Sequence, residues 1–89
     1  MQQEQWELCE IRLQTHGFMR GISFQALTIG PTGERVEGES ERFRGYGRGK
    51  NQQAAVQRLV AQLVSDGWEP QGAGRLPWWS YKFRRRVEP

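Results

Sequence analysis

The sequence contains few of the residues that catalysis, metal binding or disulfide formation requires. Among 89 residues there are one cysteine, Cys9, and one histidine, His16, so an internal disulfide is excluded. No triad, acid pair or metal-ligand spacing is present, and we predict no catalytic residue, no metal and no cofactor. Uninterrupted apolar runs reach only three residues, which excludes a membrane-spanning helix and argues against a membrane partner. We interpret Cys9 as a small core residue and His16 as a bystander in a turn.

The size and composition favour one small globular domain that spans residues 1–89. A chain of this length buries only about 60 to 65% of the surface that it exposes when unfolded, so its core is small. The hydrophobic fraction of 36% and the charged fraction of 26% are typical of such domains. The segment Met1 to Gln5 shows no basic region followed by an apolar stretch, so it predicts no signal peptide. We expect this segment to be flexible and the protein to be cytoplasmic.

Charge is distributed unevenly along the chain. Residues 1–41 carry seven acids and three arginines, a net charge of −4, whereas residues 42–89 carry ten bases and three acids, a net charge of +7. Eleven of the thirteen bases are arginine, whose guanidinium group forks onto phosphate or carboxylate. The C-terminal half therefore indicates an anionic partner. The alternative is that the arginines are solvated and only keep the protein soluble.

Alternation of apolar and polar residues predicts three strands in the N-terminal half. The segment 6–14 alternates around Cys9 and Ile11, and the segment 21–29 alternates around Phe24, so the two should pair as a hairpin. Proline and glycine between residues 30 and 33 then predict a second turn into a polar strand. This third strand suits an edge of the sheet.

The C-terminal half is predicted to hold a loop, a helix and a last strand. Glu41 to Lys50 is a basic glycine-rich loop, since three glycines in five positions do not support a regular element. Asn51 is a suitable N-cap for a helix from Asn51 to Asp66, whose apolar residues recur at spacings of three and four. A link that contains glycine leads to a last strand, Trp78 to Val87.

The predicted fold is therefore α+β, a small antiparallel sheet in β-β-β-α-β order with one helix packed on one face. The last strand is expected beside the first strand. We expect Trp68, Trp79, Tyr81 and Phe83 to form the core with the apolar stripe of the helix.

Four segments together resemble a class of short uncharacterised bacterial proteins. They are Trp6-Glu7, the helix end Leu59 to Glu69 with its G-W-E, the link that contains glycine, and the final W-W-S-Y-K-F-R-R-R. Those families of unknown function begin with W-E-Y and carry a helix ending in G-W-E before an aromatic strand that closes in basic residues. The resemblance implies a small sheet-plus-helix fold, and it implies no activity because that class has no established one.

The loop also resembles parts of two RNA-binding families. Arg44-Gly45-Tyr46-Gly47 is similar to half of a motif in RNA-recognition domains, although Arg48 and Lys50 stand where that motif has aromatic residues. The run from Gly45 to Lys50 with the helix behind it is similar to part of double-stranded-RNA-binding domains. Those domains begin and end with helices, whereas this chain is predicted to begin and end with strands.

Two basic clusters are the candidate anion-binding sites. In the loop, an anion would be bound by glycine amides, basic side chains and the start of the helix. The alternative is that the loop is a flexible connection whose charges are solvated. On the last strand, bases at alternate positions would follow phosphates while an indole stacks a base. The candidate residues are Arg44, Tyr46, Arg48, Lys50, Trp78, Lys82, Arg84, Arg85 and Arg86.

The second face of the sheet leads to a competing hypothesis. One helix cannot cover both faces, so Trp6, Leu8, Leu27, Ile29 and Trp78 are expected to be exposed on the open face. Such a surface is typical of a homodimer or of a subunit that binds a protein partner. We therefore predict a non-catalytic binding or adaptor module that contacts nucleic acid or another polyanion through the loop and the last strand. The alternative is a homodimeric or assembly-subunit protein that uses the open face.

Overall fold

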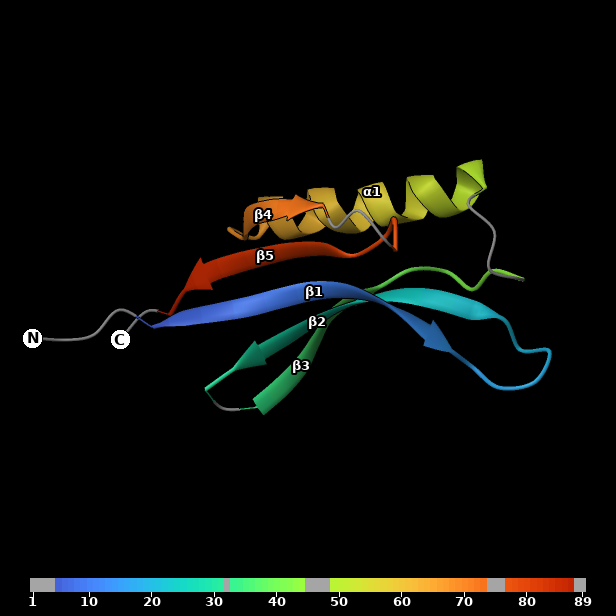
Figure 1. Ribbon diagram of the computed structural model, residues 1–89, viewed down its shortest axis with the longest axis horizontal. Coiled ribbons are helices and arrows are strands. Elements are labelled where there is room, and N and C mark those ends of the chain that lie inside the picture. Colours follow the sequence, from blue (N-terminus) through green and yellow to red (C-terminus); the bar gives the residue numbers. More distant parts are fainter. Residues whose placement is uncertain (1–4, 32, 45–48, 74–76, 88–89) are drawn as a thin grey trace, which may run out of the picture.

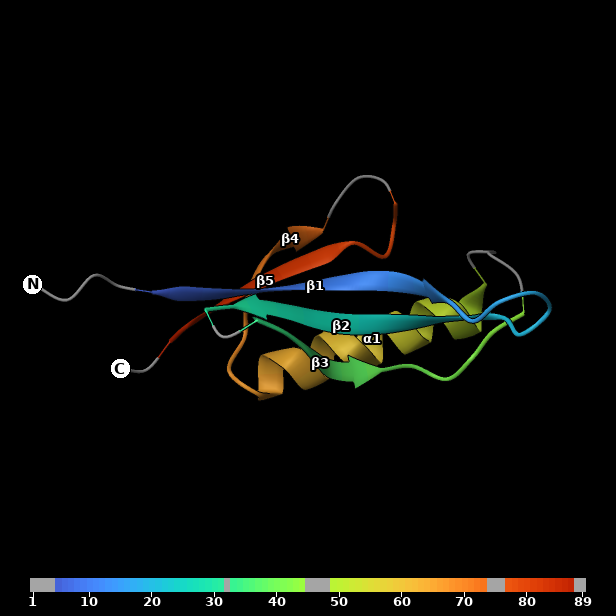
Figure 2. The ribbon, with the colours of Figure 1, turned by 90° about the horizontal axis from the view of Figure 1, so that it is seen from below.

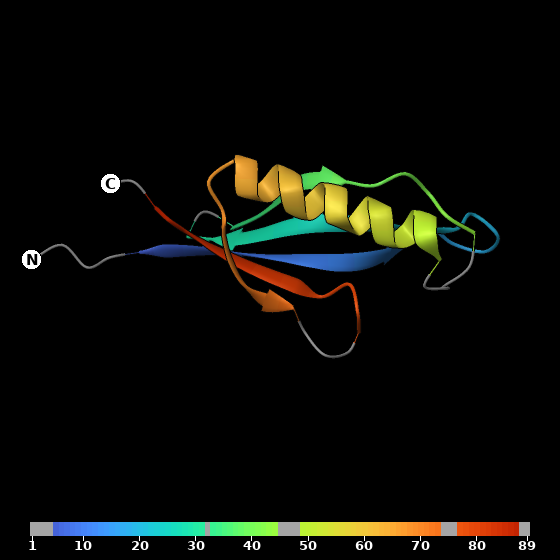
Figure 3. The same cartoon turned by 90° about the horizontal axis from the view of Figure 1, so that it is seen from above.

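A computed structural model of the protein describes residues 5–31, 33–44, 49–73 and 77–87. Within these ranges the chain forms one helix and one antiparallel sheet, in the strand order β3-β2-β1-β5-β4 (Figure 1). The elements are β1 (Trp6–Thr15), β2 (Ile22–Gly30), β3 (Gly33–Glu39), α1 (Lys50–Ser65), β4 (Glu69–Ala73) and β5 (Tyr81–Arg86). The helix lies against one face of the sheet, so it is seen behind the strands in Figure 2 and in front of them in Figure 3. The α+β prediction is confirmed.

The strand pairing follows the predicted topology and adds one strand. β1 and β2 form the expected hairpin, β3 lies at an edge, and β5 pairs with β1. β4 was not predicted, because its sequence contains Pro70 and Gly72, which disfavour strands. Both are tolerated since β4 is an edge strand with a bulge between them, where Gly72 has a φ of +108°.

The predicted helix and the predicted last strand differ from the structure at both ends, and each ends one residue earlier than predicted, at Ser65 and Arg86. The helix begins one residue earlier, at Lys50, and its N-cap is Gly49 rather than Asn51. The last strand begins at Tyr81 instead of Trp78, because residues 77–80 form a turn in which Ser80 donates hydrogen bonds from its backbone and its hydroxyl to the carbonyl of Pro77. Of the segment expected to be flexible, only Gln5 lies among the described residues.

The core lies between α1 and the sheet, where the two predicted apolar stripes meet. β1, β2 and β5 supply one side, α1 supplies the other, and Trp68 closes the end after the helix. The buried members are Cys9, Ile11, Ile22, Phe24, Ala26, Val56, Leu59, Leu63, Trp68 and Phe83. Trp79 and Tyr81 pack against this cluster while partly exposed. Burial raises the pKa of the Cys9 thiol to about 11, so the thiol is protonated at neutral pH.

Candidate functional site

The predicted basic cluster of the last strand divides between the two faces of the sheet. Lys82, Arg84 and Arg86 lie on the face without the helix, opposite Glu10, Leu8 and Trp6 of β1, respectively. The guanidinium of Arg84 stacks on the Trp6 ring at 4.3 Å from its centroid and pairs with Glu69 at 3.3 Å.

Trp78 does not join these cations. Its ring lies edge-on to Phe24 with centroids 5.6 Å apart and edge-on to Trp79 at 5.8 Å, so it belongs to the margin of the core. The expectation that Trp78 shares a face with Lys82 is wrong, because the strand begins only at Tyr81 and its alternation does not extend back to Trp78.

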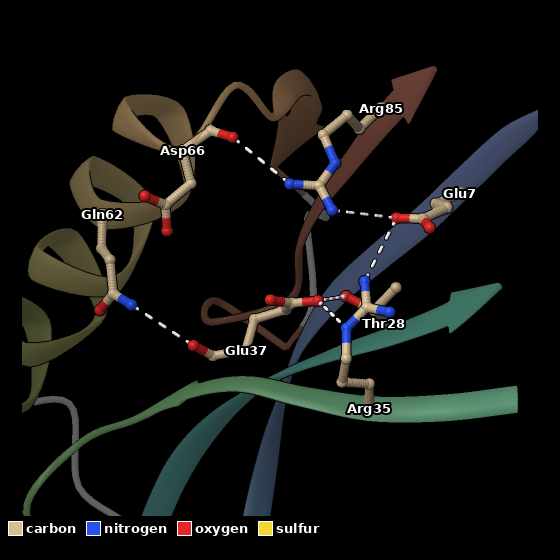
Figure 4. A network of polar contacts seen from close by, with 7 residues as sticks. All are labelled: Glu7, Thr28, Arg35, Glu37, Gln62, Asp66 and Arg85. Carbon is tan, nitrogen blue, oxygen red and sulfur yellow. Dashed lines mark hydrogen bonds and ion pairs between the residues drawn. The ribbon is translucent and has the colours of Figure 1, made fainter. Parts of the chain in front are cut away.

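Arg85 points to the opposite face and enters a network of polar side chains (Figure 4). Its guanidinium donates to the Glu7 carboxylate at 3.1 Å and to the backbone carbonyl of Asp66 at 3.3 Å, and it stacks on the Trp68 ring at 4.2 Å. Three protein groups, one on β1 and two in the segment directly after α1, therefore hold Arg85. It fastens the end of α1 to β1 and presents no free cation to a ligand.

The same network contains a second acid, Glu37. Its carboxylate accepts hydrogen bonds from Thr28 at 2.8 Å and from Arg35 at 2.6 Å. Burial raises the pKa of Glu37, but the hydrogen bonds from Arg35 and Thr28 outweigh that effect and hold the pKa below its usual value of 4.5. Hydrogen bonds from Ser23 and Gln25 likewise lower the pKa of Glu39.

These two carboxylates lead to an acid-dependent stability. A carboxyl group with a lowered pKa in the folded state stabilises the protein above its unfolded pKa, and this contribution is lost as pH falls through the folded value. We expect the free energy of unfolding, measured in urea, to be nearly constant above about pH 5.5 and to fall steadily below about pH 4.5. Glu37→Gln should flatten this dependence clearly more than Glu41→Gln, because the Glu41 carboxylate is largely exposed to water. An equal effect of the two substitutions would contradict the assignment to Glu37.

The described ends of the second predicted cluster, residues 41–44 and 49–50 of the basic loop, lie at the other end of the molecule from the end of β5 (Figure 1). Arg44 and Lys50 are exposed, while Tyr46 and Arg48 lie outside the described residues. The stretch before the loop is held in place by an antiparallel bridge between Phe43 and Ile22, with backbone hydrogen bonds of 2.7 and 2.8 Å. The two predicted clusters are therefore not brought together into one surface.

At the same end of the molecule lies the β1–β2 turn, which the sequence predicts as a turn but not as a binding site. Phe18 and Met19 at its tip are 91% and 87% exposed. Met19 has a φ of 59°, a left-handed conformation that costs a residue with a side chain about 1 to 2 kcal/mol. Arg20 follows directly. The sequence did contain a signal for an exposed binding residue here. Two large apolar residues stand between two glycines of the turn, where a hairpin normally carries small polar residues.

We call this region the basic end, defined by Phe18, Met19, Arg20, Arg42, Arg44 and Lys50. The Phe43–Ile22 bridge brings the strand of Arg42 and Arg44 alongside the turn, and α1 begins at the same end of the molecule (Figures 1 and 3). Within the described ranges, none of its four basic side chains forms a salt bridge. The first turn of α1 contains no acid, so the positive end of its dipole adds to this charge.

The acids closest in sequence bind residues outside the basic end, although the charge of Arg42 also acts on Glu39. Glu41 pairs with Arg58 of α1, and Glu39 accepts a hydrogen bond of 2.9 Å from the Ser23 hydroxyl. His16 lies 2.8 Å from the same Ser23 oxygen and 3.8 Å from the Glu39 carboxylate. The basic end therefore keeps its excess of positive charge.

His16, Ser23 and Glu39 combine residue types that are found in hydrolases, but their arrangement differs. Ser23 is fully buried and donates its only hydroxyl proton to Glu39, so the proton on His16 Nε2 points to Ser23. A nucleophile would instead give its proton to the imidazole and face a substrate. The cluster ties the start of β2 to the end of β3.

The face of the sheet away from α1 carries exposed apolar residues. We call Leu8, Leu27, Ile29 and Val36 the apolar patch; Leu8 is 58%, Ile29 44% and Val36 52% exposed. Leu8 pairs with Ile29 across β1 and β2, and Leu27 pairs with Val36 across β2 and β3, so the four side chains are contiguous. Trp6 adjoins them with an exposure of 37%. The expected open face is thus present, without Trp78.

In the part of the chain that the structure describes, no three His, Cys, Asp or Glu side chains are placed to hold a metal ion. Among the same residues, no helix has the length and apolar character needed to cross a membrane. Comparisons of the chain with protein families, with curated proteins and with solved structures find no match.

Proposed function

We propose that the protein is a non-catalytic binding module whose basic end contacts single-stranded nucleic acid. The observation that supports this most is the group of four basic residues that form no salt bridge among the described residues, at the same end of the molecule as an almost fully exposed Phe18. Cations that are not neutralised by the protein are available to phosphates, and binding releases the counterions of the nucleic acid. The arginines of β5 contribute less, because Arg84 and Arg85 already have partners within the chain.

Phe18 is the reason that we propose single-stranded rather than duplex nucleic acid as the partner. A phenyl ring at the tip of a hairpin can stack on an unpaired base, and such stacking tolerates any sequence. In a duplex the faces of the bases are covered by their neighbours, so the ring would have no surface to stack on. The left-handed Met19 next to Phe18 is the kind of local strain that folded proteins retain at binding sites.

The test is fluorescence anisotropy with short labelled single-stranded and duplex oligonucleotides at several salt concentrations. Engagement of the four cations gives a slope of log affinity against log salt of roughly −3. We expect the triple variant Arg20→Ala, Arg42→Ala, Arg44→Ala to make the slope about 2 less negative. It should also weaken binding to oligonucleotides of every sequence. Phe18→Ala should lower the affinity for single strands about five- to a hundredfold while leaving weak duplex binding unchanged.

The matched control is the double substitution Arg12→Ala with Lys82→Ala, which removes two exposed cations from the open face. It should leave both affinity and slope close to those of the unaltered protein. The absence of any binding at about 50 mM salt would refute the proposal. An equal loss in the control and in the basic-end variant would move the site to the sheet.

A further inference from the structure

The apolar patch lies on a sheet face that none of the elements in the described part of the chain covers. α1 packs on the opposite face, as Figures 2 and 3 show from the two sides. A shallow hollow of about 200 Å³ is set into the patch, with Leu8, Leu27 and Ile29 in its walls and Lys82 at its margin. Contiguous apolar surface of this kind, bordered by polar side chains, is typical of an interaction surface.

The charges on the two sides of the patch have opposite signs. On the β5 side, Lys82, Arg84 and Arg86 follow one another at alternate positions. On the β3 side, the exposed Glu34 pairs with Ile29 across the sheet and forms no salt bridge within the described residues. Glu69 pairs with Arg84 and offsets one of the three cations on the β5 side, which keeps a net positive charge, whereas Glu34 makes the β3 side acidic.

We infer that a second copy of this chain covers the open face, related to the first by a two-fold axis parallel to the strands between β1 and β2. Rotation about this axis reverses the left-to-right order of the strands in the second copy. Each residue keeps its height along the strand direction. The rotation places β3 of one copy over β5 of the other and β2 over β1. Ile29 then packs on Leu8 of the second copy, and Glu34 faces Arg84 of the second copy, each contact occurring twice.

The charge pattern excludes the other simple arrangement. A two-fold axis perpendicular to the strands would place β5 of one copy over β5 of the other. The row of Lys82, Arg84 and Arg86 would then face its own copy, and like charges opposed across an interface cost several kcal/mol. Only the axis parallel to the strands brings the basic side of one copy against the acidic side of the other.

The size of the face is adequate for a specific dimer. In this arrangement four strands of each copy overlap, and with six to ten residues each at about 3.3 Å per residue and about 4.8 Å between strands they cover roughly 500 Å² in projection. The accessible surface exceeds this projected area because the side chains make the face uneven. The area buried per partner therefore reaches about 600 Å², the lower end of stable interfaces. The arrangement also places the two basic ends at the same end of the dimer, since positions along the strands are preserved. The inference rests on the open face and does not depend on what the basic end binds.

The experiment is sedimentation equilibrium of the intact protein over about 1 μM to 1 mM, with circular dichroism to confirm folding of every variant. We expect a dimer for the unaltered chain and a monomer for Leu8→Glu and for Ile29→Glu, which place charge in the patch. Val64→Glu is the matched control, because Val64 is 47% exposed on α1, away from the open face, and the dimer should persist. A monomer at 1 mM, or a dimer that survives both patch substitutions, would overturn the inference.

A charge exchange tests the orientation. Glu34→Arg alone and Arg84→Glu alone should each weaken self-association about tenfold or more, because each opposes like charges at two symmetric positions. When the two variants are mixed, every contact between these positions is again of opposite charge, and mixed dimers should form with nearly the original affinity. If the mixture is as weak as its components, the axis parallel to the strands is wrong. Nucleic-acid binding is measured separately, so failure here leaves the function of the basic end untouched.

Discussion

Replacing Gly21 with alanine is expected to lower the free energy of unfolding by about 3 kcal/mol, a large effect for the addition of one methyl group. Gly21 has a φ of +84°, where a side chain is strained by about 1 to 2 kcal/mol. Its Cβ would also lie 2.4 Å from the carbonyl oxygen of Phe43. That oxygen accepts the backbone hydrogen bond of Ile22 at 2.8 Å, so it cannot move away without breaking the bridge.

Gly17 in the same turn separates the two causes. Its φ is +96°, but a Cβ there would meet no atom within 4 Å. Gly17→Ala therefore measures the cost of the backbone conformation alone, about 1 kcal/mol, and the difference between the two variants measures the clash. Urea denaturation of both gives the result directly. Equal effects would show that the close approach of Phe43 to Gly21 does not hold in solution.

The Gly21 substitution also bears on function, because the bridge positions Arg42 and Arg44 beside the turn. Where the variant remains folded, we expect weaker nucleic-acid binding although no charge has been removed. Gly17→Ala should bind as the unaltered protein does. The basic end is thus a product of tertiary pairing, and this explains why a search for basic runs in the sequence found only part of it.

The elements whose apolar residues recur at regular spacings could be predicted from the sequence. The alternation around Cys9 and Phe24 and the spacing in α1 report which side chains face the core, and these periods determine β1, β2 and the helix. β4 has no such period, since its strand character comes from pairing with β5 and not from its own residues. The turn at residues 77–80 was missed for a related reason: two adjacent tryptophans extend an aromatic pattern although both pack against the core.

The role of Arg85 could have been foreseen from the same alternation. Phe83 faces the core, so Arg85, two residues later, lies on the same face of β5. A cluster of three arginines suggests one exposed basic surface, yet successive strand residues point in opposite directions. The hydrogen-bond partners of Arg85 could not be predicted from the sequence. Glu7 and Asp66 are distant from Arg85 in the chain and meet it only after the sheet and the helix have packed.

Arg85→Ala should therefore act on stability, with a loss of about 2 to 4 kcal/mol in the free energy of unfolding. Among the described residues, removal of the guanidinium leaves the largely buried Glu7 carboxylate with the 3.4 Å contact to Arg35 as its one ion pair. It also leaves the Asp66 carbonyl without this donor at the end of α1 and uncovers the Trp68 ring. Arg58→Ala is the control and should cost about 1 kcal/mol or less, because its pair with Glu41 is exposed to water and lies away from the open face.

A double-mutant cycle with Glu7→Gln decides whether the pair itself carries the effect. If Arg85 stabilises the fold by neutralising Glu7, then Glu7→Gln should reduce the cost of Arg85→Ala by about 1 to 2 kcal/mol, since the neutral amide no longer needs the cation. The remaining cost belongs to the Asp66 carbonyl and Trp68. A surface arginine that binds an external polyanion would behave in the opposite way: its removal would leave the urea midpoint unchanged and weaken only the binding of nucleic acid. Additive effects of the two substitutions would show that Glu7 and Arg85 act independently.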